Sequence, residues 1–535
     1  MTLTMPSLAN VCLVIYLAAL AAGCQNTRTP SETPSKPFEP GDLLVYVATN
    51  GSDASGTGAP DRPWRTIQFA VDHVTPGSII RIRPGIYHEQ VVISGQEDSG
   101  VEGHVVVLKG EPGAIVDASG ITPTDDRGIL TIENADYILV EGLEFRNLKT
   151  PVAFSTPATP AGIIIRGSGS HIDILGNKIH GIEDNATCTQ NDNNCDSAAN
   201  GIGVYGTTPQ GLQNITIKDN EVYDNILGAS ESLTINGNVS RFVVENNYVH
   251  DNNNIGIDVI GYETDICPSC TTARNRARNG IIRANRVENN SIAHFVPNPW
   301  YAGEDGNAAG IYVDGGHHIL IERNFSSGND LGIEIASEAP GGEASDVIVA
   351  SNFFYNNFDI GIALGGYAAN ANAEGGGSIR RVKVINNSFY HNQGHSSEIT
   401  MNYRIHDLRF VNNIIFGETA IGDTYEQAAA NIQSSGLIFD NNLWWASQTI
   451  DTVPVADPHA LVADPDFSDL AGASADINSG SVAIDSGRTE TDITSWTDTF
   501  WAAQFTGATV PVHGSRDYDG NARKVGQVDI GATEQ

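Results

Sequence analysis

Basic residues are scarce in this 535-residue sequence. Only 29 Lys and Arg stand against 64 Asp and Glu, which gives a formal net charge of −35. Such a balance argues against nucleic acid as a partner and against simple electrostatic capture of any polyanion. An acidic surface suits high ionic strength, a neutral ligand or bound calcium.

Long hydrophobic runs are also lacking. The apolar stretch Ser7–Ala22 is shorter than the ~20 residues that a transmembrane helix needs. It ends in LAAG before Cys24 and resembles a bacterial lipoprotein signal, although no Lys or Arg precedes it. We expect residues 1–23 to be a signal peptide, Cys24 to anchor the chain to a membrane, and the Pro-, Ser- and Thr-rich residues 24–42 to form a tether. The predicted location is extracytoplasmic, at the cell surface or outer membrane; plain secretion is the alternative.

Cysteine is rare, with six in the chain. Apart from the two in the signal region, all lie in insertions between apolar segments: Cys188, Cys195, Cys267 and Cys270. In an exported protein this pattern predicts two disulfides that staple loops. Pairing within each loop is the simplest arrangement. Pairing between loops, or half a zinc site at the CxxC of Cys267, are alternatives.

Helical periodicity is missing after the signal region, except for a weak pattern at Thr66–His73. Instead, short alternating segments align on one another: NGIGVYG at 200–206, ESLTING at 231–237, IGIDVIG at 255–261, AGIYVDG at 309–315, LGIEIAS at 331–337 and IGIALGG at 360–366. Period-2 alternation predicts strands.

Each aligned segment is followed by a second apolar run that ends in Asn. This column comprises Asn220, Asn247, Asn285, Asn324, Asn352 and Asn387, and we expect Asn177, Asn413 and Asn442 to extend it. The interval is 27 residues from Asn220 to Asn247 and 28 from Asn324 to Asn352. A repeat of this length predicts an all-β solenoid whose rungs bury their faces by stacking.

The opening of the mature chain, residues 46–93, contains YVATNGSDASGTG and resembles the start of secreted right-handed parallel β-helix proteins, among them polysaccharide lyases and glycoside hydrolases. The resemblance implies a right-handed parallel β-helix over residues 43–455, with a helical cap at Thr66–His73. It also implies that residues 456–535 form a C-terminal capping tail, because the segments LVADPDF, SVAIDSG and VDIGATE resemble such tails. The Asn column is then structural and lies at the turn between the second and third sheets.

The aligned segments form the first sheet in this fold. Their Ile and Val point inward, and the residues between them point to solvent. One outward column reads Gly203, Thr234, Asp258, Tyr312, Glu334, Ala363, and the other reads Tyr205, Asn236, Ile260, Asp314, Ala336, Gly365. Insertions at 183–199, 261–279, 290–308, 338–346 and 366–378 can wall a groove over this sheet.

Charge in these columns is confined to the middle rungs. Asp314 and Glu334 are diagonal neighbours with Cα atoms roughly 8 Å apart by strand geometry. The segments IYVD and DLGIEI around them resemble the catalytic segment of β-helical β-xylosidases, although Gly315 and Gly316 replace aromatic residues of that family. The resemblance implies Asp314 as nucleophile or base and Glu334 as general acid, with Asp258 and Tyr312 shaping the site.

Polar and aromatic residues around the groove are candidates for binding sugar: Tyr205, Asn236, Glu263, Trp300, Tyr301, Glu304, Asp305, Glu338 and Tyr367. Packing within loops is the alternative for Trp300 and Tyr301. His317 and His318 open the second sheet and are weaker candidates.

The main interpretation is an extracytoplasmic enzyme that hydrolyses a polysaccharide or oligosaccharide with paired carboxylates and acts as a monomer without a required cofactor, although structural calcium is compatible with the acidic walls. A lyase or uronan epimerase is the alternative. No Lys lies between Lys218 and Lys383 to serve as its base, which leaves Tyr312 with an Arg or calcium partner. A non-catalytic glycan-binding solenoid is the third possibility.

Overall fold

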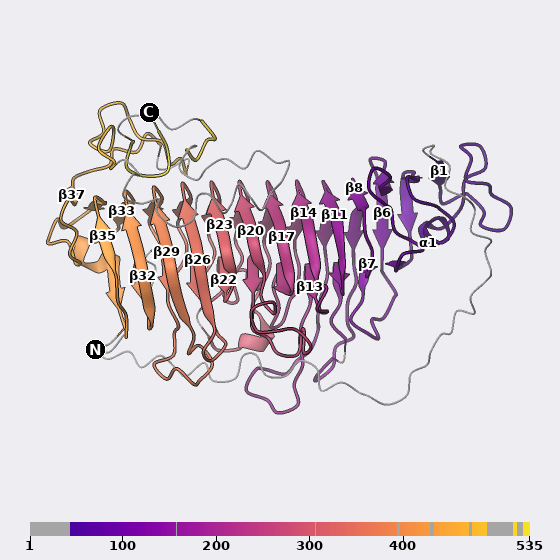
Figure 1. The fold of residues 1–535 in the computed structure, drawn as a ribbon, viewed down its shortest axis with the longest axis horizontal. Helices are drawn as coiled ribbons and strands as arrows, with labels where there is room; N and C mark the ends of the chain where they lie inside the picture. The colour runs from indigo at the N-terminus through magenta and orange to yellow at the C-terminus, as the bar shows by residue number, and fades with distance from the viewer. Residues whose placement is uncertain are drawn as a thin grey trace.

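Stacked strands of alternating apolar and polar residues build a right-handed parallel β-helix with three long sheets (Figure 1). The computed structural model describes residues 43–156, 158–304, 306–392, 396–428, 433–469, 473–488, 517–521 and 528–534. The predicted signal peptide, Cys24 and the tether lie outside these residues, as does Asp305. Within the described residues, no helix is long and apolar enough to cross a bilayer.

The first sheet contains the aligned segments and has 11 described strands. They are β4 (Val91–Ser94), β7 (Gly128–Glu133), β10 (Ala161–Arg166), β13 (Asn200–Gly206), β16 (Leu233–Gly237), β19 (Ile257–Ile260), β22 (Ala309–Asp314), β25 (Leu331–Ala336), β28 (Ile360–Leu364), β31 (Ile399–Met401) and β34 (Tyr425–Gln427).

The second sheet has 13 described strands and follows the first sheet in each rung. It consists of β1 (Leu44–Val47), β2 (Ile79–Ile82), β5 (Val106–Gly110), β8 (Ile138–Glu141), β11 (Gly169–Leu175), β14 (Leu212–Lys218), β17 (Val239–Glu245), β20 (Arg278–Arg283), β23 (His317–Glu322), β26 (Glu343–Ala350), β29 (Ser378–Ile385), β32 (Ile405–Val411) and β35 (Ile438–Asp440).

The third sheet closes each rung and also has 13 described strands. These are β3 (Gly85–Tyr87), β6 (Ala114–Asp117), β9 (Glu144–Arg146), β12 (Lys178–His180), β15 (Glu221–Tyr223), β18 (Tyr248–His250), β21 (Arg286–Glu288), β24 (Phe325–Ser327), β27 (Phe353–Tyr355), β30 (Ser388–Tyr390), β33 (Ile414–Gly417), β36 (Leu443–Ala446) and β37 (Leu461–Val462).

The predicted Asn column is a continuous hydrogen-bonded ladder at the turn between the second and third sheets. The backbone N–H and Nδ2 of each Asn donate to Oδ1 of the next, as from Asn247 to Asn285 at 2.9 and 3.0 Å. The ladder runs without a break from Asn177 to Asn442, and all its members are buried. The residue before the Asn has positive φ, even at Ala284 and Arg323, which makes the turn tight.

A second Asn ladder lies between the third and first sheets and was not predicted. It comprises Asn225, Asn252, Asn290, Asn329, Asn357 and Asn392, and it ends on the buried carboxyl of Glu398. Each member follows a residue of the first ladder by five positions, so the sequence carried the signal. The two ladders flank the three-residue strands of the third sheet.

Apolar side chains from all three sheets fill the core. The predicted inward residues of the first sheet, such as Ile257, Val259, Ile311 and Val313, are fully buried there. At the N-terminal end, α1 (Ile67–Val71) begins at the N-cap Thr66 and inserts its apolar side chains into the same core (Figure 1). This matches the predicted helical cap.

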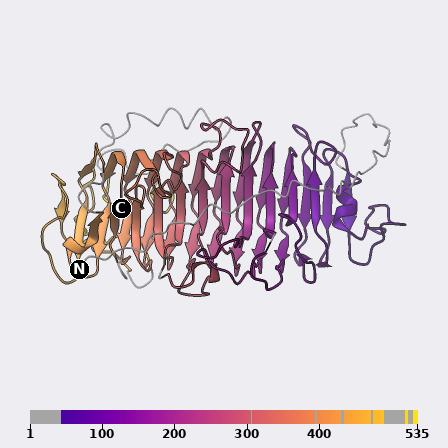
Figure 2. The ribbon, with the colours of Figure 1, turned by 90° about the horizontal axis from the view of Figure 1, so that it is seen from below.

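The C-terminal tail combines two roles. Strand β37 adds the last strand to the third sheet, as a capping segment does. Farther along, Phe467, Ile477 and Ile530 pack on the outer face of that sheet. The tail lies above the solenoid in Figure 1, whereas the loops of residues 181–199 and 289–308 project below it; Figure 2 views this loop side.

The ladder leads to a stability prediction. Asn285→Ala should lower the free energy of unfolding by roughly 2–5 kcal/mol, because the backbone N–H and Nδ2 of Asn247 lose their shared acceptor, Oδ1 of Asn324 loses one of its two donors, and an unsatisfied buried group costs ~1–3 kcal/mol. Urea unfolding followed by circular dichroism measures the change. Gln210→Ala, at an exposed turn, is the control. Equal stability of the two variants would contradict a stabilising ladder.

Candidate active site

The first outward column of the first sheet has the register that the sequence predicted. Gly203 pairs with Thr234, Thr234 with Asp258, Asp258 with Tyr312, Tyr312 with Glu334, and Glu334 with Ala363. The predicted register of the second outward column is wrong at the step from β19 to β22. Regular pairing between β19 and β22 ends at Val259 and Val313, and Ile260 instead makes an antiparallel bridge with Gly315.

The prediction that these residues point to open solvent is also wrong. Only 3% of Asp258, 3% of Tyr312 and 7% of Asp314 is exposed. Tyr312 packs in an apolar cluster above the sheet, with Ala309, Leu331, Ala336, Ile360 and Ala363. Glu334 is only partly buried. These side chains project from the outer face of the sheet, as predicted. Neighbouring residues and loops cover them there, so most of their surface has no contact with water.

Two buried aspartates hold loops at the entry to the first sheet. Asp184 accepts hydrogen bonds from the hydroxyls of Thr150 and Thr156 and from the N–H groups of Ala186 and Ala198. Asp330 likewise accepts bonds from the backbone of the loop before β22, at Ile292, Asn307 and Ala308. These bonds tie the two insertions to the solenoid.

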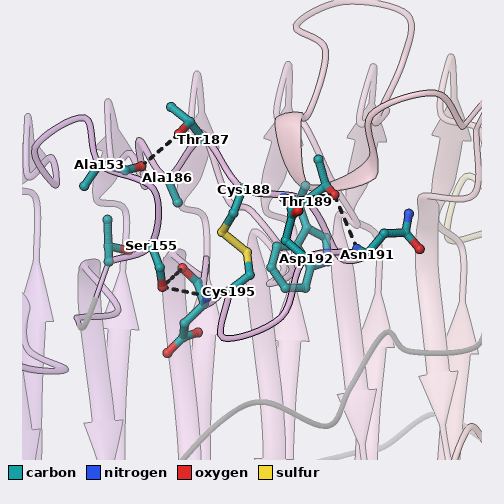
Figure 3. Close-up of a disulfide and its surroundings, with 12 residues drawn as sticks. Ala153, Ser155, Ala186, Thr187, Cys188, Thr189, Asn191, Asp192 and Cys195 are labelled. Atoms are coloured by element: carbon teal, nitrogen blue, oxygen red, sulfur yellow. Dashed lines mark hydrogen bonds between the residues drawn. A yellow bond between two sulfur atoms is a disulfide. The ribbon is translucent and has the colours of Figure 1, made fainter.

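The disulfides join cysteines within each loop, as the simplest prediction held. Cys188 pairs with Cys195 and Cys267 with Cys270. Figure 3 shows the first pair beside Ser155, whose hydroxyl accepts a bond from the N–H of Asp196. Oxidised cysteines agree with an extracytoplasmic protein.

Trp300 and Tyr301 pack against the first disulfide. They form η1 (Pro299–Tyr301), are each 6% exposed, and cluster with Cys188 and Cys195. Loop packing, the alternative for these two aromatic residues, describes their position.

Asp314, Glu338 and Tyr312 form the centre of the site. Asp314 Oδ1 accepts a 2.7 Å hydrogen bond from the backbone N–H of Glu338, and the Tyr312 hydroxyl donates to Glu338 Oε1 at 3.4 Å. Burial, then the charge of Glu338, raises the pKa of Asp314 well above its usual range. Burial and the charges of Glu334 and Glu338 do the same to the pKa of Tyr312.

Two further carboxyls extend this acidic centre. Burial, followed by repulsion from Glu338, raises the pKa of Glu334 to about 8. Burial and the charges of Glu231 and Asp314 raise the pKa of Asp258 well above its usual range. Oδ1 of Asp258 is buried and has no hydrogen-bond partner among the described residues. Such a cluster retains protons at neutral pH or gathers around a cation.

The other predicted sugar-binding residues are divided among three places. Tyr205, Asn236 and Glu263 line one cavity over the first sheet. Tyr367 lies near Tyr312 and contributes to raising the pKa of that phenol. Glu304 bonds to Gln190 and Asn307 within the loops.

His317, His318 and Asp346 lie outside the groove on the second sheet, yet each offers a metal-ligand atom within 4.8 Å of the others. The guanidinium of Arg381 already donates to both oxygens of Asp346, at 2.7 and 2.6 Å. Burial, Arg276 and His318 lower the pKa of His317 to about 3. The nearby guanidinium groups oppose a bound cation.

Sequence reasoning missed Glu231 and Arg166. Glu231 opens one of the aligned segments, so its charge at a repeated position was a usable signal. Arg166 pairs with Tyr205 from the preceding rung, which the six-segment alignment did not include.

The glycine at 315, where β-xylosidases carry an aromatic residue, has a φ of 74°, and a Cβ there would lie 2.7 Å from the Tyr262 ring.

The raised carboxyl pKa values predict that the folded protein becomes less stable as the pH rises. Glu334 has an ordinary value of 4.5 and a folded-state pKa of about 8. Between these values the folded protein binds more protons than the unfolded chain, so the free energy of unfolding decreases as pH rises. Thermal unfolding with a chelator present measures this decrease, and Glu334→Gln should flatten it. Parallel curves for the wild type and the variant would contradict the assignment.

Comparison with known proteins identifies one long relative and one short one. The chain is 32% identical over 455 residues to YwoF of Bacillus subtilis, a protein of uncharacterised function, and the match covers 81% of this chain and 90% of YwoF. It is 37% identical over 114 residues to pectate lyase PEL9 of Emericella nidulans. This match covers 19% of this chain and 28% of PEL9. No family model matches.

Solved structures show weaker likeness. Pectate lyase Pel9A aligns over 92% of this chain and 96% of its own, with a TM-score of 0.45 and 14% identity. The alginate lyase AlyGC aligns over 79% of this chain and 53% of its own, with a TM-score of 0.43 and 15% identity. The narrower resemblance to β-xylosidases is not confirmed. By its long match to the Bacillus protein, the chain belongs to the YwoF family.

Proposed function

We propose that this protein is a polysaccharide lyase that cleaves an acidic glycan in the groove over β19, β22 and β25. The observation that carries the proposal is the cluster of Asp258, Asp314, Glu334 and Glu338, whose carboxyls lie on a covered sheet surface. The partial match to a pectate lyase adds support and favours elimination over hydrolysis. This reverses the order of the two enzyme interpretations made from the sequence.

A uronate substrate requires a positive charge in this site, because its carboxylate would otherwise meet several acidic groups. An oxygen-only ligand set suits calcium or magnesium. The fit is supported by the buried Oδ1 of Asp258, which lacks a partner among the described residues, and by the proximity of Asp314 and Glu338. These three carboxyls would hold the cation. When bound, it would neutralise the uronate carboxylate and acidify the neighbouring C–H bond.

Glu334 is the residue best suited to accept the proton. It is partly exposed, and its pKa of about 8 lies near the neutral range in which a general base works best. Tyr312 is unsuited to this role, because its phenol stays protonated with a pKa well above 10. Its hydroxyl donates to Glu338 and positions that carboxylate.

The elimination balances without any further reactant. Glu334 takes the proton from C5 of the uronate, the bond from C4 to the glycosidic oxygen breaks, and a C4–C5 double bond forms. The departing oxygen takes a proton from water, and the hydroxide that remains takes the proton from Glu334, which restores both the water and the carboxylate. The conjugated product absorbs in the ultraviolet, whereas hydrolysis yields only a saturated reducing sugar.

Hydrolysis by Asp314 and Glu334 is the second candidate. It is favoured by the mutual repulsion of these carboxyls, which keeps one of them protonated as an acid. In that case Asp314 is the nucleophile or base and Glu334 the general acid. Incubation with plant and algal polyuronates and with neutral glycans separates the two reactions by the ultraviolet absorbance of the products.

Glu334→Gln should reduce turnover on a cleaved polyuronate by about 10²–10⁴-fold, the usual contribution of a general base. Asp314→Asn should also lower it, by weakening the cation site. Initial rates of product absorbance measure both effects, and Glu102→Gln, at an exposed turn, is the control. Near-normal rates in both groove variants would refute the proposed site. The remaining candidates would then be a non-catalytic glycan-binding solenoid, or catalysis by the wall carboxylates Glu263 and Glu304.

Removal of divalent cations should abolish elimination. Dialysis against a chelator is expected to stop product formation, and added calcium or magnesium should restore it. Asp258→Asn should raise the cation concentration needed for half-maximal activity by about tenfold or more, the size of effect seen when a metal site loses a supporting group. Full activity in the presence of the chelator would contradict a cation-assisted mechanism.

A further inference from the structure

A separate cavity lies over the N-terminal half of the first sheet. Its volume is about 380 Å³, and its lining includes residues of β7, β10, β13, β16 and β19. Five neighbouring strands span roughly 19 Å at the usual spacing between strands. The lining therefore crosses five rungs, and it reaches β19 at Ile260, next to the carboxyl cluster.

Two residues of the lining, Asn236 and Arg166, each carry a buried polar atom without a hydrogen-bond partner among the described residues. Asn236 is 3% exposed; its Nδ2 donates to Glu263 at 2.7 Å, whereas its Oδ1 is buried and unpartnered among the described residues. Nε of Arg166 is likewise buried and has no acceptor within the described part of the chain. A ligand would need to offer a donor to the first atom and an acceptor to the second. A sugar hydroxyl does both.

Charge in the cavity disfavours an anionic ligand. Asp126, Glu133, Glu231, Glu263 and Asp265 all line it, and Arg166 is the cation among the lining residues. That guanidinium is already engaged by Glu133 at 3.2 Å and by the carbonyl oxygen of Asp126 at 3.0 Å. A uronate carboxylate would be repelled here, whereas neutral hydroxyl groups can bond to both carboxylates and carboxylic acids.

Apolar surface completes the match to a pyranose ring. Ile164, Ile260 and Ile266 contribute to the lining, together with Tyr205. The Tyr205 hydroxyl donates to Asn200 at 2.9 Å, which fixes the position of its ring. Burial, then the charges of Glu231 and Glu263, keeps the phenol neutral by raising its pKa.

We infer that this cavity binds neutral sugar units of a mixed polysaccharide, whose uronate unit lies over the carboxyl cluster of the neighbouring rungs. The position of the uronate rests on the proposed lyase function; the neutral site stands on its own contacts. The substrate class is then a heteroglycan with neutral sugars next to the cleaved uronate, rather than a uniform polyuronate.

Calorimetric titration of the wild-type protein with short neutral xylo-, galacto- and manno-oligosaccharides tests the inference. At least one series should bind, and more tightly than an oligogalacturonate of equal length under chelating conditions. Asn236→Ala should weaken that binding by roughly tenfold, the effect of losing one hydrogen bond in a buried site. Thr207→Trp should block the cavity, because Thr207 lines it from a turn.

Gln210→Trp is the matched control, since Gln210 is exposed in the same turn and does not line the cavity. It should bind like the wild type. The inference is overturned if no neutral series binds, if the charged oligomer binds more tightly, or if the Thr207 and Asn236 variants bind normally. These results are independent of the ultraviolet assay. If no unsaturated product forms but neutral oligosaccharides still bind, the proposed lyase function is refuted and the neutral-sugar site stands.

Discussion

The stacking of rungs is the constraint on which the rest of this structure depends. A single rung has no hydrophobic interior of its own, and its backbone groups find partners only in the rungs before and after it. At two of the three corners, buried Asn side chains continue that pairing through the turns. The ladders satisfy polar groups that would otherwise be costly to bury, and they hold successive turns in the same geometry.

This regularity explains how a cluster of carboxyls can persist on the first sheet. Parallel pairing joins Asp258 to Tyr312 and Tyr312 to Glu334, so these residues remain on adjacent rungs despite the repulsion between acidic groups. The cost appears as raised pKa values at Asp258, Asp314 and Glu334. Stability is thus lowered locally where charges are gathered, which is common at functional sites.

The groove is divided by its chemistry. Over β22 and β25 the carboxyls lie close together, and in the proposed function they would hold a cation beside an acidic sugar. From β10 to β16 the surface mixes apolar side chains, one engaged Arg and two buried polar atoms that have no hydrogen-bond partner in the described part of the chain. A single sheet can present both surfaces because outward residues change from rung to rung while the inward residues stay apolar. Asp184 and Asp330 anchor the insertions beside these surfaces through hydrogen bonds to the loop backbone.

The sequence by itself determined the fold class, the inward residues and the Asn ladder, since these depend on short-range alternation and a repeating interval. It also determined which residues of the first outward column are neighbours, because parallel strands in one register place equal positions side by side, but it did not show that this register ends before Ile260 and Asp314. Only the tertiary structure decided that Asp258 and Tyr312 are covered, that Trp300 packs on a disulfide, and that Glu338 joins Asp314. Those features depend on how irregular insertions fold back over the sheet, and no periodic pattern encodes that path.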